Sequence, residues 1–256
     1  MAMLEVDHLQ KIYVTRFGGN QVQALSDVSF TVETGEFVAI MGESGSGKTT
    51  LLNILAALDK PTRGQVLLNG KSLVGISEKE ISAFRRDNLG FVFQDFNLLD
   101  TFSVRDNIFL PLVLAGKGYT EMEKRLEPIA QKLGIGGILS KYPYEISGGQ
   151  KQRAAVARAL ITNPQLVLAD EPTGALDSHS SQMLLSTIQS INEDLGATIL
   201  MVTHDAFSAS YANRILFLRD GAIFTEIRKG GDSRRTFFEK ILDVLTMMGG
   251  GMSDVR

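Results

Sequence analysis

Cysteine is absent from this chain of 256 residues. The protein can therefore form no disulfide, hold no metal through thiolates and use no cysteine nucleophile, and such a composition fits a reducing compartment. The excess of negative over positive charge is also small, since 29 acidic residues oppose 26 lysines and arginines and leave a formal net charge of only −3. No broad positive field is available to attract nucleic acid or an anionic bilayer. We therefore expect a cytosolic protein with no nucleic-acid partner.

Long apolar runs are missing as well. No stretch approaches the roughly 20 residues that are needed to span a bilayer, and residues 1–7 lack the basic region and apolar stretch of a signal peptide. We expect no direct membrane insertion, so any membrane role must come through a partner. The length allows one large α/β domain or two small ones.

The glycine-rich loop at residues 42–49 fits the phosphate-binding pattern G-x-x-x-x-G-K-[ST]. An apolar run at residues 37–41 predicts a buried strand before it, and residues 50–55 open an apolar helix after it. Glycines let several backbone N–H groups point at one anion. Lys48 would reach the β- and γ-phosphates, and the Thr49 hydroxyl would bind Mg²⁺. The residues expected at the nucleotide are Gly42, Glu43, Ser44, Gly45, Ser46, Gly47, Lys48, Thr49 and Thr50.

An acidic pair follows a second apolar run. Residues 166–169 read as a parallel strand that is covered on both faces, and Asp170 and Glu171 come directly after it. Open α/β sheets bind their ligands at the carboxyl ends of the strands. Asp170 suits a role in holding Mg²⁺ through water, and Glu171 suits the base that activates or orients the attacking water.

Residues 146–150, with the sequence I-S-G-G-Q, precede a predicted helix at residues 151–161. Ser147 could cap this helix, and the glycines would expose N–H groups at its positive end, which makes a second anion site. A simpler interpretation is a flexible loop before a helix. Because one domain needs only one γ-phosphate site, we expect this loop to face the nucleotide of another subunit.

Together these motifs resemble the nucleotide-binding subunit of ATP-binding-cassette (ABC) transporters, from residue 4 to about residue 228. Residues 146–150 resemble the LSGGQ signature of that family, with isoleucine in place of leucine. The resemblance implies that Tyr13 stacks on adenine and that Gln94 touches Mg²⁺ and relays movement of the permease. It also implies that Asp177 contacts the opposite subunit and that His204 contacts the γ-phosphate.

The family further implies ATP and Mg²⁺ bound between two copies of the chain in a homodimer. The phosphate loop of one copy would face the signature residues of the other, namely Ser147, Gly148, Gly149 and Gln150. The catalytic residues would be Lys48, Glu171 and His204. ATP would close the dimer, hydrolysis would reopen it, and the movement would be passed to an integral membrane permease.

A finer resemblance is to ATPases that work with permeases of the macrolide-export and lipoprotein-release type, which have a large extracellular domain. Within that group, Y-P-Y-E at residues 142–145 and the segment 241–250 resemble bacitracin and lantibiotic resistance systems of Gram-positive bacteria. The protein would then lie on the inner face of the cell membrane, held there by its permease.

The expected fold is an α/β, RecA-like P-loop NTPase core with an antiparallel β subdomain and a helical, signature-bearing subdomain at about residues 94–152. The nucleotide-binding domain would take residues 1–230. Runs at residues 4–13 and 21–32 around a turn at 18–20 predict the antiparallel part.

Residues 231–256 would form a C-terminal helix and tail. Apolar residues at three- and four-residue spacing predict an amphipathic helix over residues 233–248. The stripe comprises Phe238, Ile241, Leu242, Leu245 and Met248. We expect this helix to pack on its own core or on a second subunit, with binding to a membrane surface as the alternative.

Three other functions share parts of this pattern. An ABC ATPase that regulates cell-wall hydrolases through a permease-like partner would carry the same motifs. A soluble ABC protein of DNA repair or translation would generally have a coiled-coil insertion or a second cassette, and this chain has neither. A P-loop kinase would keep the phosphate loop, but the signature loop and His204 argue against it.

Overall fold

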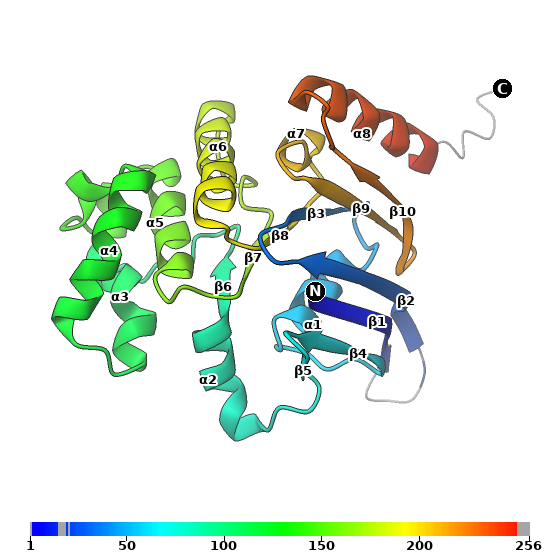
Figure 1. Cartoon of the computed structure of the whole chain (residues 1–256), viewed down its shortest axis with the longest axis horizontal. Coiled ribbons are helices and arrows are strands. Elements are labelled where there is room, and N and C mark those ends of the chain that lie inside the picture. The colour runs from blue at the N-terminus through cyan, green and yellow to red at the C-terminus, as the bar shows by residue number, and fades with distance from the viewer. Residues whose placement is uncertain (1, 15–18, 20, 250–256) are drawn as a thin grey trace. The chain divides into compact units, whose positions relative to one another are not determined.

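A computed structural model describes residues 2–14, 19 and 21–249 of the chain. The chain divides into two compact units, residues 1–74 with 201–256 and residues 75–200. Figure 1 labels the elements of both units. The predicted turn at residues 18–20 rests on residues 18 and 20, which lie outside the described residues.

The first unit is built on strands that follow one another in the order β5-β4-β1-β2-β10-β9-β3. Its antiparallel part pairs Leu4 with Val32 and with Leu68. Every second residue from Val28 to Val32 is buried, which is the period-two pattern of a sheet with one covered face. The strands are β1 (Ala2–Val14), β2 (Gln21–Glu33), β3 (Phe37–Met41), β4 (Arg63–Leu68), β5 (Lys71–Ser72), β9 (Arg214–Arg219) and β10 (Ala222–Arg228).

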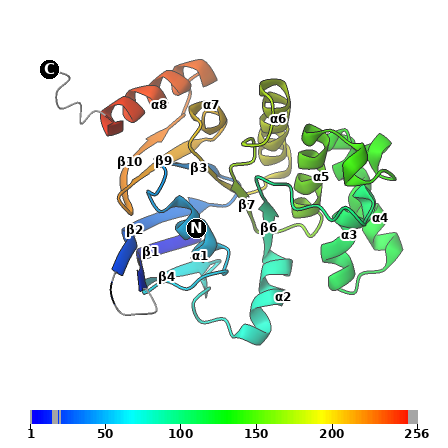
Figure 2. The same ribbon diagram turned by 180° about the vertical axis from the view of Figure 1, so that it is seen from behind.

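Strand β3 runs parallel to β9, with Val38 opposite Arg214 and Met41 opposite Phe217. All five residues of β3 are buried, so the strand predicted at residues 37–41 is confirmed. The helices of this unit are α1 (Lys48–Leu55), α7 (Ala206–Ala209) and α8 (Arg234–Gly249). Figures 1 and 2 show α8 beside α7, from opposite sides.

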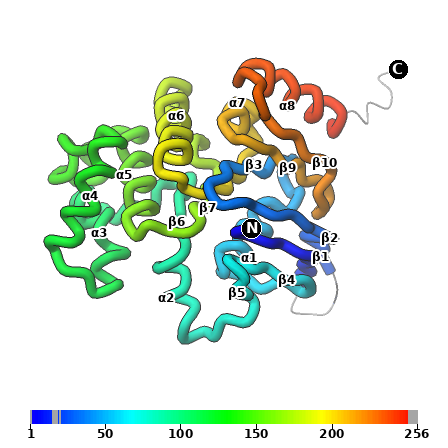
Figure 3. The backbone as a smooth tube through the Cα atoms, viewed as in Figure 1, coloured from blue at the N-terminus to red at the C-terminus, as the bar shows by residue number. Residues whose placement is uncertain are grey.

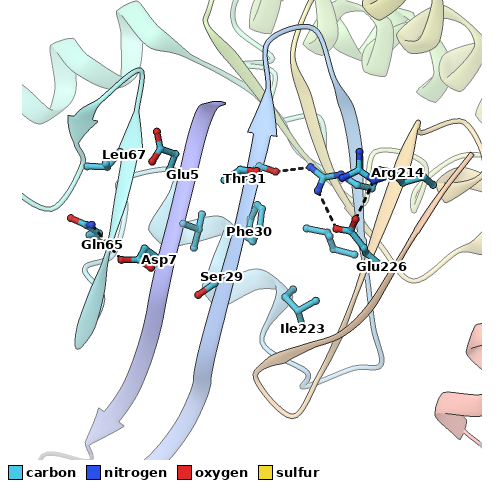
Figure 4. Close-up of a pocket in the computed structure, with 13 residues that line it drawn as sticks. Glu5, Asp7, Ser29, Phe30, Thr31, Gln65, Leu67, Arg214, Ile223 and Glu226 are labelled. Atoms are coloured by element: carbon cyan, nitrogen blue, oxygen red, sulfur yellow. Dashed lines mark hydrogen bonds and ion pairs between the residues drawn. The ribbon is translucent and has the colours of Figure 1, made fainter. Parts of the chain in front are cut away.

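A buried arginine of β9 joins β2 and β10 of the first unit, together with the turn before β3. Arg214 is only 5 % exposed, and it donates to Glu36 Oε1 at 2.7 Å and to Glu226 Oε2 at 3.1 Å, as well as to the carbonyl of Thr31. Figure 4 shows the bonds to Thr31 and Glu226. A buried charge is tolerated when it is paired in this way. The cavity beside it, about 540 Å³, is lined by residues of β1, β2, β4, β9 and β10 and by none of the predicted site residues.

The second unit carries most of the helices, which the tube in Figure 3 follows through space. Strands β6 and β7 are parallel, with Leu89 opposite Leu166. Helix α5 packs against α3, α4, α6 and β6. The elements are α2 (Glu78–Asn88), β6 (Leu89–Val92), α3 (Val104–Leu114), α4 (Tyr119–Leu133), α5 (Gly148–Leu160), β7 (Leu166–Asp170) and α6 (Ser178–Leu195), with short 3₁₀ turns at Gly136–Ile138 and Pro143–Glu145. Strand β8 (Ile199–Thr203) leads back into the first unit.

Helix α8 confirms the predicted C-terminal helix but corrects its inner face. Phe237, Ile241 and Met248 are buried, whereas Phe238 is half-buried and Leu242 is 42 % exposed. A three- and four-residue spacing fits two neighbouring faces of one helix, and the packing of α8 against α7 selects between them. As expected, the helix packs within its own chain.

Candidate functional site

The phosphate loop leads from β3 into α1, which begins at Lys48. The Lys48 ammonium donates to the carbonyls of Gly42 at 2.7 Å and Glu43 at 2.8 Å, and the residue is only 9 % exposed. The lysine therefore lies folded over its own loop. This arrangement holds one positive charge where the loop can bring it to an anion.

The glycines of this loop are required by its geometry. Gly45 and Gly47 have φ angles of +82° and +104°, a region that side chains rarely adopt. A Cβ at Gly42 would lie 2.3 Å from the carbonyl oxygen of Leu218 in β9. The buried Ser46 Oγ has no hydrogen-bond partner among the described residues. An orphaned hydroxyl inside a cradle of N–H groups and one lysine fits a phosphate ligand.

Tyr13, the expected adenine-stacking residue, is 41 % exposed, and its side chain is held by contacts with Asp59 and Lys11. Its hydroxyl donates to Asp59 Oδ2 at 2.8 Å, and Lys11 donates to Asp59 Oδ1 at 2.6 Å while lying 4.8 Å from the centre of the tyrosine ring. Burial raises the pKa of the Asp59 carboxyl, but the hydrogen bonds from Lys11 and Tyr13 outweigh it and leave the pKa lowered. Lys11 and Asp59 were not predicted from the sequence.

His204 follows β8 and is exposed. The residues on both sides of it are fixed, because Thr203 is fully buried and its hydroxyl accepts a hydrogen bond from the Asp205 N–H at 3.1 Å. Asp205 in turn caps α7. The first unit thus carries Tyr13, the phosphate loop and His204.

In the second unit, Asp170 ends β7 and Glu171 turns the chain sharply with a φ of +44°. The Glu171 carbonyl accepts a hydrogen bond from the Gly174 N–H at 2.9 Å, which closes the turn. A left-handed backbone at a residue other than glycine is strained, and such strain collects at functional sites. The predicted acidic pair therefore stands where a buried strand gives way to a tight turn.

The loop with Gln94 lies against this acidic turn. A Cβ at Gly174 would approach the Gln94 side chain to 2.9 Å, so the glycine makes room for the glutamine. Gln152 of α5, fully buried, donates to the Phe93 carbonyl at 3.1 Å and to the Pro172 carbonyl at 2.8 Å. One side chain therefore ties the residue before Gln94 to the residue after Glu171.

A second residue of α5 holds the chain just after Gln94. Arg158 donates to the carbonyls of Phe96, at 2.9 Å, and Asn97. These two residues have φ angles of +62° and +48°, so the arginine supports a strained turn. Burial lowers the pKa of the Arg158 guanidinium. Neither Gln152 nor Arg158 was predicted, and a polar residue on the inner face of a predicted helix was the only available signal.

The signature loop is a helix start. Helix α5 begins at Gly148, three residues earlier than predicted, so the glycines belong to its first turn. The Ser147 hydroxyl accepts from the Gln150 N–H at 3.3 Å, and the Gln150 side chain accepts from the Ser147 N–H at 2.9 Å. This reciprocal capping box confirms Ser147 as the cap. The capping box does not bond every N–H group of the first turn, and the remaining groups point out of the start of the helix.

Asp177 lies at the neighbouring helix start. Its carboxylate caps α6 by accepting from the Ser180 N–H at 2.9 Å and from the Ser180 hydroxyl at 2.7 Å. These hydrogen bonds lower its pKa. A Cβ at Gly149 would come within 3.0 Å of Ser180 Oγ, so the glycine lets the two helix starts approach closely. The second unit thus brings the signature and Asp177 together.

No three histidine or acidic side chains gather into a metal-binding cluster within the described residues. The predicted Mg²⁺ ligands are a hydroxyl, an amide and a carboxylate, on Thr49, Gln94 and Asp170. These hard oxygen donors suit Mg²⁺, which commonly binds through one or two carboxylates together with phosphate oxygens and water. The donor set fits a metal that arrives with a nucleotide.

A phosphate loop after a buried parallel strand, with a capped Gly-Gly helix start and an acidic strand end, defines a nucleotide-binding cassette. Comparison with known proteins agrees, because residues 25–174 match the ABC transporter family. The chain belongs to this family, and its fold is the α/β RecA-like P-loop NTPase fold. It is an ATP-binding and ATP-hydrolysing transporter subunit.

Among its relatives, the chain is 48 % identical to the bacitracin export ATP-binding protein BceA of Halalkalibacterium halodurans, over 99 % of this chain and 100 % of that protein. It is 44 % identical to the macrolide export ATP-binding/permease protein MacB of Syntrophobacter fumaroxidans, over 91 % of this chain and 32 % of MacB. The dimeric structure of MJ0796, a bacterial ABC transporter cassette, is similar with a TM-score of 0.80 and 39 % identity, over 90 % of this chain and all of that one. Over the described residues, no helix has both the length and the apolar character to cross a bilayer.

Proposed function

We propose that this chain energises a membrane permease that protects the cell against antimicrobial peptides of the bacitracin and lantibiotic kind. The observation that carries the proposal is the match to a bacitracin export ATP-binding protein along 99 % of this chain and the whole of that relative. A match of this extent includes α8, beyond the nucleotide-binding region. The permease would have a large extracellular domain and would hold the chain at the cytoplasmic face of the membrane.

Two copies would bind ATP between them, head to tail. The phosphate loop of one copy, with Lys48, would face Ser147 and Gln150 of the other. Tyr13 would stack on the adenine, and Asp177 would contact the opposite copy. Such a site explains why one chain has two separate anion-binding features, the phosphate loop and the first turn of α5.

Catalysis would rest on positioning and on charge. Glu171 would accept the proton of the attacking water, His204 would contact the γ-phosphate, and Lys48 would stabilise the developing charge. Thr49, Gln94 and Asp170 would hold Mg²⁺, which supplies positive charge to the phosphate oxygens when it is bound. The close packing of Gln94 on Gly174 supports a shared role for their two loops.

The permease would dock along residues 94–114. This segment exposes four large apolar side chains, and exposed apolar surface is a common feature of interaction sites. The exposed fractions are 45 % at Leu99, 40 % at Phe102, 54 % at Val113 and 67 % at Leu114.

The test is purification of the tagged chain from detergent-solubilised membranes of its own host, with mass spectrometry of what binds. We expect an integral membrane protein with a large extracellular domain. Leu98 is half-buried beside the exposed Leu99, and the double variant Leu98→Ser, Leu99→Ser should lose the membrane protein. The control Leu195→Ser, at a residue that is 60 % exposed, should keep it. Equal recovery with all three proteins would place the dock elsewhere, and recovery of no membrane protein would contradict the proposal.

Macrolide export is the second candidate, because the chain is 44 % identical to the corresponding part of MacB. Growth assays separate the two. A host that carries Glu171→Gln should become sensitive to bacitracin or lantibiotics under the main proposal, and to macrolides under the second. Sensitivity to neither, with a defect in cell-wall hydrolysis, would favour the permease-like regulator.

A further inference from the structure

Helix α7 is too short to be stable alone, since it has only four residues, Ala206–Ala209. It begins two residues after His204. Asp205 caps it by accepting hydrogen bonds from the N–H groups of Phe207, at 3.1 Å, and Ser208, at 2.9 Å. The same Asp205 is bonded through its own N–H to Thr203 at the end of β8. Hydrogen bonds of Asp205 therefore connect the turn that carries His204 to helix α7.

Support for α7 comes from α8. The rings of Phe207 and Tyr211 meet edge to face with centroids 5.5 Å apart. The Arg234 guanidinium, at the first residue of α8, lies 4.4 Å from the centre of the Tyr211 ring and 5.8 Å from that of Phe207. Phe237, one turn further along α8, has no exposed surface. Figures 1 and 2 both show α7 and α8 side by side.

The start of α8 is itself anchored, so it can act as a support. The Ser233 hydroxyl accepts a hydrogen bond from the Thr236 N–H at 3.1 Å, which caps the helix. Lys240 bonds to Asp232 at 2.6 Å and fixes the first turns to the segment before them. Arg234 is thereby held over the Phe207 and Tyr211 rings from a fixed base, and the fully buried Phe237 lies on the helix that contacts α7.

We infer that α8 holds the His204 turn in place through α7, with Arg234 and Phe237 as positioning residues. The contacts run from α8 through the Phe207–Tyr211 pair to the Asp205 cap next to His204. A loss of α8 support is expected to move the His204 imidazole and to slow ATP turnover. The effect on turnover rests on the proposed role of His204, whereas the effect on the position of the imidazole does not.

NMR tests whether α8 fixes the position of the His204 imidazole. The chain has three histidines, His8, His179 and His204, so ring-labelled protein gives three imidazole signals, and His204→Ala assigns the third. We expect Arg234→Ala and Phe237→Ala to shift or broaden the His204 signal and to leave the other two unchanged. The matched controls are Arg235→Ala and Met247→Ala, on the same helix at positions that are 89 % and 70 % exposed, and they should move none.

An unmoved His204 signal in the folded Arg234→Ala protein would overturn the inference. If Phe237→Ala unfolds the chain, all three signals collapse together, and Arg234→Ala then decides because that side chain is exposed. A shift of all three signals in Arg234→Ala would also overturn it, because the effect would then not be local to the His204 turn.

Turnover provides the second measurement. Arg234→Ala should lower kcat for ATP by up to about tenfold and leave KM unchanged, because the phosphate loop is untouched while a contact to the γ-phosphate is misplaced. In a His204→Ala background the same substitution should add no further loss. An equal loss in both backgrounds would overturn the inference. Normal turnover of His204→Ala itself would contradict the proposed role of His204, and the NMR result would still show whether α8 positions it.

Discussion

At the scale of single residues, Lys48 is the centre of the phosphate loop. Its ammonium is bonded to two carbonyls of the loop, at Gly42 and Glu43, and is almost fully shielded from solvent. A charge held in this way loses little freedom when a phosphate replaces those carbonyls. The loop therefore has a pre-positioned cation and backbone N–H groups for the same anion.

Replacement of Lys48 by alanine should abolish turnover while the fold is kept. The phosphates would lose their compensating charge, and the rate should fall on the order of a hundredfold or more. Phosphate release measures the rate, and circular dichroism checks the fold. Lys79→Ala, at an exposed lysine of α2, is the control. Equal rates in wild type and Lys48→Ala would remove this loop as the catalytic site.

The Lys11–Asp59–Tyr13 cluster should make stability depend on pH. The pKa of Asp59 is lowered in the folded chain, so the unfolded chain binds its proton more readily. The stabilisation is then present above the ordinary aspartate pKa and is lost as pH falls through the lowered value. The Lys11–Asp59 ion pair is partly solvated, so it contributes at most about 1 kcal/mol to the free energy of unfolding.

Urea unfolding of wild type and Asp59→Asn at several pH values tests this dependence. The wild type should be the more stable at pH 7, and the difference should shrink below about pH 4. A difference that stays constant down to acid pH would show that Asp59 stabilises the chain by packing alone.

At the scale of elements, helix α5 holds together the residues of the second unit that belong to the proposed site. Its first turn is the signature, Gln152 ties the loops of Gln94 and Glu171, and Arg158 supports the turn after Gln94. A shift of α5 would therefore move the signature and both loops together. This is a direct route by which a partner bound near residues 94–114 could influence hydrolysis.

Gln152→Leu should lower stability and turnover together. The buried carbonyl of Pro172 and the partly buried carbonyl of Phe93 would lose their donor, which costs about 1–3 kcal/mol. Urea denaturation measures the change in the free energy of unfolding. The control, Gln131→Leu on the exposed side of α4, should have little effect. A Gln152→Leu protein as stable as wild type would mean that the two loops are held by other contacts.

The sequence was informative wherever the chemistry is local. The phosphate loop, the acidic strand end and Ser147 all depend on neighbours within a few residues, and β3, β7 and the cap of α5 lie where the patterns predict them. Asp59 and Gln152 act on groups tens of residues away, at Tyr13 and Phe93, so no local pattern could reveal them. The inner face of α8 was misjudged for the same reason, because α7 determines it.

At the scale of the whole molecule, two copies of the chain would be joined through ATP in the proposed site. In this proposal the phosphate loop and the signature helix start would each offer N–H groups to an anion, and a two-copy site would use both. MJ0796, an ABC transporter cassette similar to this chain, has been solved as a dimer, and a further dimeric structure of it holds ADP and Pi. ATP would drive closure because it binds the closed state more tightly than the open one.

The Glu171→Gln variant tests this central claim most directly. Glutamine can hydrogen-bond the attacking water but cannot accept its proton, so ATP should bind and remain intact. Size-exclusion chromatography with light scattering, in ATP and Mg²⁺, should show a stable dimer for Glu171→Gln, and a monomer when Lys48→Ala is added or Mg²⁺ is removed. A Glu171→Gln protein that binds ATP and remains a monomer would contradict the two-copy site.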